Sequence, residues 1–338
     1  MQINPILAEL TRGGEVESVH RGAFAVARAD GSIAVATGDI YKPVFPRSAV
    51  KSIQALAIFR SGANEKFPFT DEMLALTCAS HRGEPRHVAL AQQMLEMIGC
   101  TVADLECGAH LPGDPMARDA LRKRGEAPSA LHNNCSGKHA GMLSVARALG
   151  VPVRGYSERD HPVQQLVRQG LADVTGALLS EAHCGTDGCS VPTWGVPLSA
   201  LAKGFARMGA GEGLDADTAK AANRLCDAAS ANSFFVSGTG RPDTDLMTAF
   251  GGRLMLKGGA EGVYCGALRD KGLGFAIKID DGKNEAAELV AASLIAAISA
   301  PSGNEAAALA PWTGHMLRNV RGIEVGAFRA TAVARPTL

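Results

Sequence analysis

The order of strand-like and helix-like segments along the chain limits the possible folds more than any other feature of the sequence. Residues 22–39 alternate in polarity around an Ala-Asp-Gly-Ser turn, which predicts a hairpin of two strands. Apolar residues at helical spacing then predict helices at 48–62, 71–80, 84–99, 136–150, 161–174, 198–209 and 215–232. Strand patterns return at 252–259, 262–270 and 272–282, and a strongly apolar helix pattern follows at 284–300.

This order predicts an α+β fold in which an antiparallel sheet is assembled from both chain ends. The helical part, at about residues 45–250, is then inserted between the N-terminal and C-terminal sheet segments. Residues 100–135 are rich in Gly, Pro and charge, so we expect them to form an irregular connection. The sequence shows no internal repeat and no linker, and we therefore expect residues 1–338 to form a single unit.

Composition and charge restrict the partners of the protein. A chain of 338 residues with 46% hydrophobic residues can bury a large core. Its 34 basic and 34 acidic residues balance without blocks of one sign, which argues against nucleic acid or an anionic membrane as a partner and favours a small molecule. The sequence shows neither a secretory leader nor an apolar run of membrane-spanning length. We therefore expect a cytoplasmic protein whose eight cysteines are reduced, buried or metal-bound.

The stretch VFPRSAVKSIQALAIFRSG, residues 44–62, places Ser48 and Lys51 three residues apart at the expected start of a helix. Residues three apart share a helix face, and this is the S-x-x-K spacing with which beta-lactamases and penicillin-binding proteins use a serine nucleophile. A lysine acts as the base when burial or a second cation lowers its pKa. The alternative is that Ser48 caps the helix and Lys51 faces solvent.

Two further segments carry residues suited to the same chemistry. KGGAEG at 257–262 follows an expected strand, so Lys257 is a candidate second cation, although K-G-G is also an ordinary turn. CASHRGEPRH at 78–87 joins two expected helices. There Ser80 could act in a proton relay and Arg82 could receive a substrate carboxylate, while the alternative is that the polar residues cap the helices.

Two Gly-rich polar loops each contain a cysteine. HNNCSGKHAG at 132–141 contains Cys135, and HCGTDGCS at 183–190 contains Cys189. Histidines and an aspartate surround them, so a soft divalent metal ion is a candidate ligand. The spacing matches no zinc-finger pattern, and the alternative is a pair of reduced structural thiols.

Five motifs occur in a fixed order: PRSAVKSIQA, CASHRGEPRH, NNCSGKHAGML, DGCSVPTW and KGGAEGV. In this order they resemble the Rhizobium-etli-type L-asparaginases, which form class 3, the asparaginase II family. The motifs extend over most of the chain, from about residue 20 to 280. The resemblance implies a fold like that of serine beta-lactamases and glutaminases, a homodimer, and hydrolysis of L-asparagine to aspartate and ammonia.

The same resemblance implies roles for individual residues. Position by position, the motifs match the family's catalytic residues at Ser48, Lys51, Ser80 and Lys257, and its Zn²⁺ ligands at Cys135, Lys138 and Cys189. Lys278, in the sequence AIKIDDG, is the alternative to Lys257 as the second catalytic lysine. We expect contacts to the substrate from Arg47, His81, Arg82 and His139. Whether the metal is catalytic, orients the substrate or is structural stays open at this point.

Three other functions fit parts of this pattern. Glutamine differs from asparagine by one methylene, which a pocket discriminates by about 10- to 200-fold. A penicillin-recognising acyltransferase or beta-lactamase would share the serine and lysine chemistry, but the missing leader and a poorly placed S-x-N motif argue against it. A non-catalytic zinc-binding protein would retain both cysteine loops and form no covalent adduct at Ser48.

Overall fold

The computed structural model describes residues 3–337, which divide into two compact units. The first unit contains the residues up to Ala49, Val196–Gly213 and the residues from Asp245 onward. The second unit contains Val50–Gly195 and Leu214–Thr244. The prediction that residues 1–338 act as one functional unit stays a prediction.

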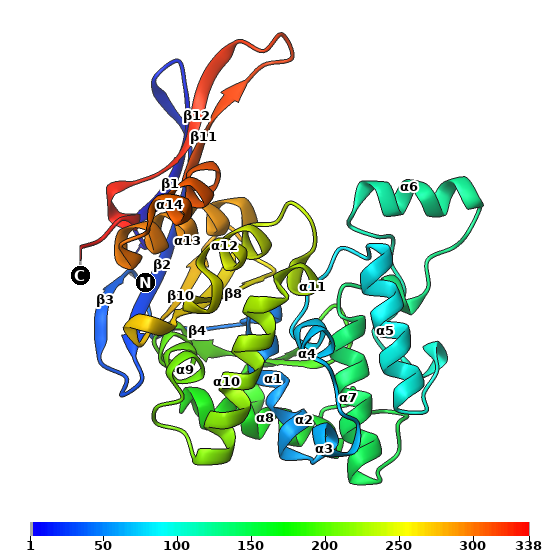
Figure 1. The fold of residues 1–338 in the computed structure, drawn as a ribbon. Helices are drawn as coiled ribbons and strands as arrows, with labels where there is room; N and C mark the ends of the chain where they lie inside the picture. Colours follow the sequence, from blue (N-terminus) through cyan, green and yellow to red (C-terminus); the bar gives the residue numbers. More distant parts are fainter. Residues whose placement is uncertain (1–2, 338) are drawn as a thin grey trace. The chain divides into compact units, whose positions relative to one another are not determined.

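The first unit is built on an antiparallel sheet with the strand order β11-β12-β1-β2-β10-β9-β8, in which β3 also pairs with β2. The strands are β1 (Ile6–Arg12), β2 (Glu15–Arg28), β3 (Ile33–Thr37), β8 (Leu254–Gly259), β9 (Val263–Leu268), β10 (Leu273–Ile279), β11 (Gly314–Arg318) and β12 (Glu324–Ala330). Figure 1 shows the blue N-terminal strands β1 and β2 beside the red strands β11 and β12. The predicted α+β class, with a sheet from both chain ends and a helical middle, is confirmed.

The centre of the sheet is the pairing of β2 with β10. It runs from Gly22 opposite Ile279 to Arg28 opposite Leu273. Residues 23–27 are all buried, so this half of β2 has apolar residues on both faces instead of the alternation of a half-exposed strand. Helix α9 (Leu198–Ala210) packs on β2, β9 and β10, and α13 (Asn284–Ser299) packs on β1, β9 and β10.

Helix α9 approaches the sheet at a glycine of β10. A Cβ atom at Gly274 would lie 2.1 Å from the backbone nitrogen of Ala206 and 2.2 Å from the backbone oxygen of Ala202. Since real Cβ atoms do not come this close to backbone atoms, the helix and the strand can touch here because residue 274 has no side chain.

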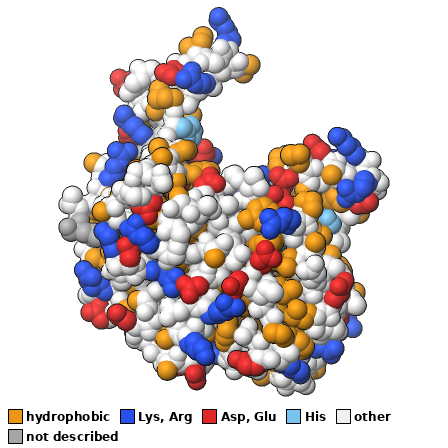
Figure 2. Space-filling model, in the orientation of Figure 1, with side chains coloured by type: hydrophobic (Ala, Val, Ile, Leu, Met, Phe, Trp, Pro, Cys, Tyr) orange, Lys and Arg blue, Asp and Glu red, His pale blue; other side chains and the backbone are white. Residues whose placement is uncertain are grey.

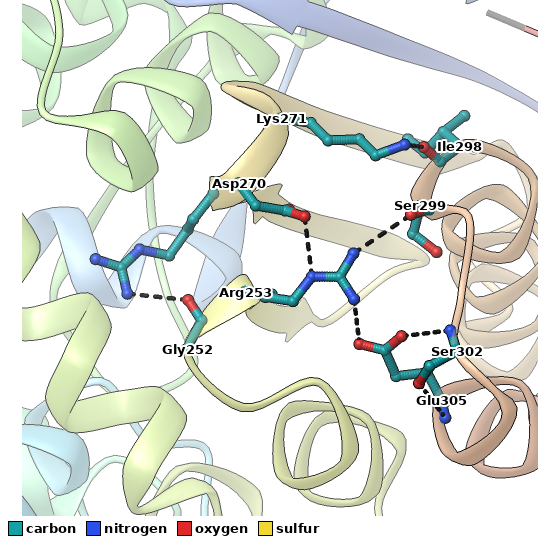
Figure 3. Close-up of polar contacts among 9 residues, drawn as sticks. Gly252, Arg253, Asp270, Lys271, Ile298, Ser299, Ser302 and Glu305 are labelled. Atoms are coloured by element: carbon teal, nitrogen blue, oxygen red, sulfur yellow. Dashed lines mark hydrogen bonds and ion pairs between the residues drawn. The ribbon is translucent and has the colours of Figure 1, made fainter.

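A polar cluster joins the connections at the edge of the first unit (Figure 3). Arg253 donates through Nε to Asp270 at 2.9 Å and pairs through Nη1 with the buried carboxylate of Glu305. Glu305 also accepts a bond from the backbone nitrogen of Ser302 at 2.6 Å, within the capping box that starts α14 (Gly303–Leu309). Lys271 donates to a backbone carbonyl of α13. The cluster ties the 3₁₀ turns beside β8 and β10 to the C-terminal helices.

The second unit is mainly helical. Its helices are α1 (Lys51–Gln54), α2 (Leu56–Arg60), α3 (Ala63–Lys66), α4 (Asp71–Thr77), α5 (Pro85–Met97), α6 (Pro115–Arg124), α7 (Ser136–Leu149), α8 (Pro162–Thr175), α10 (Ala216–Ala231) and α11 (Ser233–Ser237). Caps explain several of the boundaries: Asp215 accepts from the backbone nitrogen of Thr218 at the start of α10, and glycines in the left-handed conformation end α7 and α8. Strands β5 (Cys184–Thr186) and β6 (Pro192–Trp194) form a small ribbon.

Short elements complete the description. Strands β4 (Pro43–Val44) and β7 (Val196–Pro197) pair within the first unit. Helix α12 (Pro242–Phe250) contains the boundary between the units. Among residues 3–337, none of the helices is long and apolar enough to cross a membrane. On the face seen in Figure 2, acidic and basic side chains are interspersed, as the balanced composition predicts.

Three sequence predictions differ from the structure. The expected helix at 48–62 is divided into a 3₁₀ turn and the short helices α1 and α2. Residues 115–124, expected to be irregular, form α6, which starts with an Asp-Pro cap and has one buried side chain. Strands β1, β11 and β12 were not predicted. In β11 no residue is buried, and in β12 only Phe328 and Ala330 are buried, so neither strand has a continuous apolar face that a pattern could reveal.

Replacing Gly274 with alanine tests the contact between α9 and β10. We expect Gly274→Ala to lower the free energy of unfolding by roughly 1–3 kcal/mol, because the new methyl group forces the helix away from the strand. Urea denaturation followed by circular dichroism measures the change. Gly303→Ala is the matched control, since its Cβ meets nothing within 4 Å at the first turn of α14. Equal stability of Gly274→Ala and the wild type would contradict the close packing.

Candidate active site

Ser48 lies in a 3₁₀ turn, Arg47–Val50, that directly precedes α1. The N-cap position of α1 is Val50, and no side chain makes a capping hydrogen bond there. Arg47 has φ 53°, in the left-handed region that non-glycine residues rarely adopt. Ser48 is therefore not the cap of α1, and the residue before it is held in a strained conformation of the kind that clusters at functional sites.

The turn that carries Ser48 packs against the end of β8 within the first unit. A Cβ at Gly259 would lie 2.6 Å from the backbone oxygen of Pro46 and 3.1 Å from the backbone nitrogen of Ala49. The K-G-G sequence is thus needed for close packing of strand and turn. Lys257, two residues earlier in β8, is 1% exposed and donates to the backbone oxygen of Gly258 at 2.6 Å.

Lys278 lies on a different strand of the same sheet, since β9 separates β10 from β8. Its Nζ donates to the backbone oxygen of Ile279 at 2.8 Å and to that of Glu261. Burial lowers the pKa of Lys278, and nearby carboxylates partly oppose this effect. The choice of Lys257 as the second catalytic lysine stays a prediction, and the packing of β8 on the Ser48 turn favours it.

Lys51 is the most enclosed cation of the second unit, with 1% of its surface exposed. Its Nζ donates to the backbone oxygen of Ala79, to Ser80 Oγ at 3.0 Å and to Cys135 Sγ at 3.1 Å. Three acceptors thus surround the amine nitrogen. The structure thus brings Lys51 and Ser80 together, and it adds a contact to Cys135 that sequence spacing does not reveal.

Cys135, Lys138 and Cys189 form one buried group, each with 3–4% exposure. Lys138 Nζ donates to Cys189 Sγ at 2.9 Å. The first turn of α7 is held close to α4 by Gly137, whose Cβ would lie 2.4 Å from the backbone oxygen of Leu76. This helix contact places Lys138 and Cys135 beside the end of α4, where Ser80 follows.

The two cysteines behave as one acid that shares a proton. A hydrogen bond from Cys189 lowers the pKa of Cys135 well below its usual value, and the charges of Lys51 and Lys138 add to this against burial. The same shared hydrogen bond, together with burial, raises the pKa of Cys189. Burial alone would lower the pKa of Lys138, but the two sulfurs outweigh it and the net shift is upward. These opposite shifts favour the thiolate form at Cys135 and the thiol form at Cys189.

These three side chains fit a metal ion. Two sulfurs and an amine nitrogen are the soft and borderline donors that Zn²⁺ accepts, and a fourth position would be left for water or substrate. Zn–S and Zn–N bonds of about 2.3 and 2.0 Å would separate sulfur and nitrogen by roughly 3.5 Å. The 2.9 Å contact between Lys138 and Cys189 would therefore have to open by a few tenths of an ångström. Among the described residues, no group of three His, Cys, Asp or Glu offers another such site.

His139 presents one ring nitrogen without a partner. Its Nδ1 lies 2.5 Å from the hydroxyl of Tyr156, which also accepts a bond from the backbone nitrogen of Glu106 at 3.0 Å. We assign the Tyr156 proton to this contact, so the proton of the neutral ring is on Nε2. Within residues 3–337, Nε2 is buried and has no hydrogen-bond partner. Burial and the charges of Lys138 and Lys51 lower the pKa of His139, which keeps the ring neutral despite the nearby Cys189 carbonyl. The sequence motifs gave no signal for Tyr156.

Two of the other three predicted substrate contacts, His81 and Arg82, form hydrogen bonds with protein groups. His81 is 2% exposed, accepts from the backbone nitrogen of Gly83 through Nδ1 and lies 2.9 Å from Ser136 Oγ through Nε2. Arg82 donates to the backbone oxygens of Thr239 and Gly113. The substrate contacts of His81, Arg82 and Arg47 stay predictions. The hydrogen bonds of His81 and Arg82 also stabilise the loop after α4.

A stack of rings extends from this loop. The ring of His81 stacks on that of His87 at 4.9 Å between centroids, and His87 stacks on Phe234 at 4.5 Å. Arg86 lies over the Phe234 ring at 4.8 Å. His87 also contacts the backbone oxygen of Phe234 through Nε2 at 2.9 Å. The stack fixes the start of α5 against α11 and so supports the Ser80 loop.

Comparison with known proteins assigns the family. The sequence model of the L-asparaginase II family matches residues 8–330, nearly the whole chain, and the protein therefore belongs to this family. Membership supports an amidohydrolase of the asparaginase type that acts on a small molecule. No curated protein sequence matches the chain significantly.

Solved structures give weaker likenesses. A beta-lactamase from Mycobacterium bovis is 14% identical, with 86% of this chain and 95% of that chain covered and a TM-score of 0.37. The structure of Mglu in its Tris and glutamate form is 15% identical, with 83% and 60% covered and a TM-score of 0.34. Likenesses this distant carry no argument about mechanism, and the beta-lactamase-like fold implied by the motifs stays an expectation beside the confirmed α+β class.

Replacing His87 tests the protonation of the ring stack. Burial lowers the pKa of His87, so the unfolded chain binds a proton below about pH 6.5 that the folded protein resists. The stability that the neutral ring provides is thus present above this pH and is lost as the pH falls. We expect His87→Gln to reduce the acid-side slope of the unfolding free energy by up to roughly 1.4 kcal/mol per pH unit. Denaturation curves at several pH values measure the slope.

His315→Gln is the control for this comparison, because His315 is exposed on β11 in the first unit. An unchanged slope in His87→Gln would show that the ring takes up its proton as readily in the folded as in the unfolded protein.

Proposed function

We propose that this protein is an L-asparagine amidohydrolase of the Rhizobium-etli-type class 3, with the activity of L-asparaginase (EC 3.5.1.1). The observation that carries the proposal is the buried amine of Lys51 bonded to Ser80 and Cys135, in a chain that belongs to the L-asparaginase II family. This one contact joins three of the five motifs. The substrate is a free amino-acid amide, and we further propose a cytoplasmic homodimer.

The reaction begins with attack of Ser48 Oγ on the side-chain amide carbon of asparagine. Lys51, as the neutral amine, takes the hydroxyl proton, and the carbon–nitrogen bond then breaks to release ammonia. The product of this half-reaction is an aspartyl ester on Ser48. Water attacks the ester in the second half-reaction, and aspartate leaves with regeneration of the Ser48 hydroxyl. Ser80 and Lys257 move protons to and from Lys51 in both halves.

Three features of the described residues support these roles. Ser80 Oγ lies 3.0 Å from Lys51 Nζ, a distance over which a proton can pass. Ser48 lies outside any capping bond of α1, and Arg47 before it is strained. The proposal requires Ser48 Oγ to meet Lys51 Nζ three residues along the chain, which is the spacing of one helical turn.

We also propose that Cys135, Lys138 and Cys189 hold Zn²⁺. When bound there, the ion supplies a Lewis acid with an open coordination position close to the reaction centre. The residues themselves exclude water, since each is nearly fully buried. His139 places an Nε2–H donor without a protein partner in the same region, which suits a substrate oxygen.

Glutaminase is the second candidate activity. Hydrolysis of the two side-chain amides follows the same chemistry. The site described here has no feature that would distinguish the side chain of glutamine, which is longer by one methylene, from that of asparagine. Ammonia release from asparagine, from glutamine and from a penicillin-type substrate, compared at equal concentrations, separates the three activities. A protein that binds zinc and turns over none of them would be the non-catalytic alternative.

Replacing Ser48 tests the nucleophile. We expect Ser48→Ala to reduce ammonia release from asparagine by about a thousandfold or more, because the covalent route is lost. A coupled ammonia assay measures the rate, and the thermal transition checks the fold. Ser52→Ala is the matched control: Ser52 lies in α1, is buried, and its hydroxyl has no partner among the described residues, so its loss is expected to leave the rate unchanged. Substantial turnover in Ser48→Ala would end the assignment.

Replacing Cys189 tests the metal site. Elemental analysis of protein prepared without chelators is expected to find about one zinc per chain, in keeping with a single set of three ligands. Cys189→Ser should lose most of this metal, because a hydroxyl replaces a thiolate ligand. Cys265→Ser, at a buried cysteine of β9, should retain it. If the wild-type protein contains no stoichiometric metal, Cys135 and Cys189 are structural thiols. The proposed Ser48 chemistry does not depend on this outcome.

A further inference from the structure

A pocket of about 550 Å³ lies within the first unit, and no step of the proposed reaction uses it. It is lined by residues before β1, by the segment from Asp39 to Arg47, by the start of α9, and by the ends of β8 and β10. Ser48 and Lys257 are not among the lining residues, whereas Arg47, a predicted substrate contact, and Lys278, the alternative to Lys257, both line the pocket. The volume falls within the range of roughly 300–1,000 Å³ that small-molecule sites occupy.

Two lysines, Lys42 and Lys278, are among the residues that line the pocket. Lys278 is half-buried, and its two hydrogen bonds to backbone oxygens leave one of three ammonium protons without a partner among residues 3–337. Lys42 makes no side-chain hydrogen bond or ion pair among the described residues, and its charge disfavours that of Lys278. A ligand carboxylate beside these two amines could accept hydrogen bonds from both, although the charges of Glu261 and Asp280 already favour the charge of Lys278.

Carboxylates from two segments line the same pocket. Asp280 accepts from the side-chain amide of Asn4 at 2.9 Å, and the oxygen of that amide accepts from the backbone nitrogen of Asp39 at 2.8 Å. Asp39 Oδ1 accepts two further backbone bonds in its own turn. These bonds fix both carboxylates and leave one oxygen of each without a partner among the described residues. Glu261 adds a third carboxylate. A ligand ammonium group fits this side of the pocket.

The lining of the pocket also includes apolar side chains. Ile3 and Phe45 are large side chains with 76% and 45% exposure, and Val44 and Leu198 lie beside them in the lining. Exposed apolar surface that borders a pocket is stabilised when a ligand side chain covers it. The lining therefore offers cations, carboxylates and apolar side chains, which match the α-carboxylate, the α-ammonium group and the side chain of an apolar amino acid.

We propose that this pocket binds a free α-amino acid with an apolar side chain, as a site separate from the one that carries Ser48. Lys278 and Lys42 receive the carboxylate, and Asp280 and Asp39 receive the ammonium group. The ligand differs from asparagine in its side chain, so the site would let the protein respond to amino acids that it does not hydrolyse. The inference does not depend on the proposed asparaginase activity.

Isothermal titration calorimetry of the full-length protein with leucine tests the proposal. We expect saturable binding of about one leucine per chain, and binding at least roughly tenfold weaker for isocaproate, which lacks the ammonium group, and for isoamylamine, which lacks the carboxylate. Lys278→Met should weaken leucine binding by a similar factor. Lys271→Met is the matched control, because Lys271 donates to α13 outside the pocket.

Further measurements keep the outcome interpretable. If Lys278→Met fails to fold by circular dichroism, Lys42→Met at an exposed position replaces it. Ser48→Ala should bind leucine as the wild type does, which separates this site from the catalytic one. Absence of saturable leucine binding would overturn the proposal, as would isocaproate binding as tight as leucine, which would indicate a simple anion site. Loss of leucine binding in Ser48→Ala would show that leucine occupies the catalytic site.

Discussion

The buried amine of Lys51 is the constraint on which the second unit depends. A polar group with 1% exposure is stable in a protein interior only if it has hydrogen-bond partners, because burial of an unpaired polar group costs roughly 2–7 kcal/mol. The three acceptors come from the end of α4, from the serine after it and from the cysteine before α7. The short, broken helices after Arg47 and the tight contact of α7 with α4 both serve to bring these groups to one point.

Glycines make those approaches possible. Gly137 lets α7 reach the carbonyl of Leu76, and Gly259 lets β8 reach the turn that carries Ser48. In each case the glycine lies one or two residues from a candidate functional lysine, Lys138 or Lys257. The motifs N-C-S-G-K and K-G-G therefore combine a chemical group with the small residue that allows it to be placed. This explains why the pattern of the motif is more informative than the lysine alone.

The sequence predicted the class of the fold, and its motifs named several residues that the structure brings together, although their roles stay predictions. The limits of the sequence-based prediction are physical. Apolar periodicity located α7, α8, α9, α10 and α13, whose faces are buried. It failed for β11 and β12, which together contain only two buried residues. Motif order pointed to Lys51, Ser80 and Cys135, but spacing cannot show that one amine touches both partners. Tyr156 was missed because its role comes from a hydrogen bond to His139, 17 residues away, with no pattern between them.

The pKa shifts of Cys135, Cys189 and Lys138 indicate which protons a metal ion would have to displace on binding. Cys135 favours the thiolate form, since its pKa is lowered. Cys189 and Lys138 keep their protons, since theirs are raised. A divalent ion bound by all three groups would have to displace the protons of Cys189 and Lys138, so its apparent affinity would fall as the pH falls. The hydrogen bonds from Lys51 to Cys135 and from Lys138 to Cys189 thus oppose metal binding at low pH.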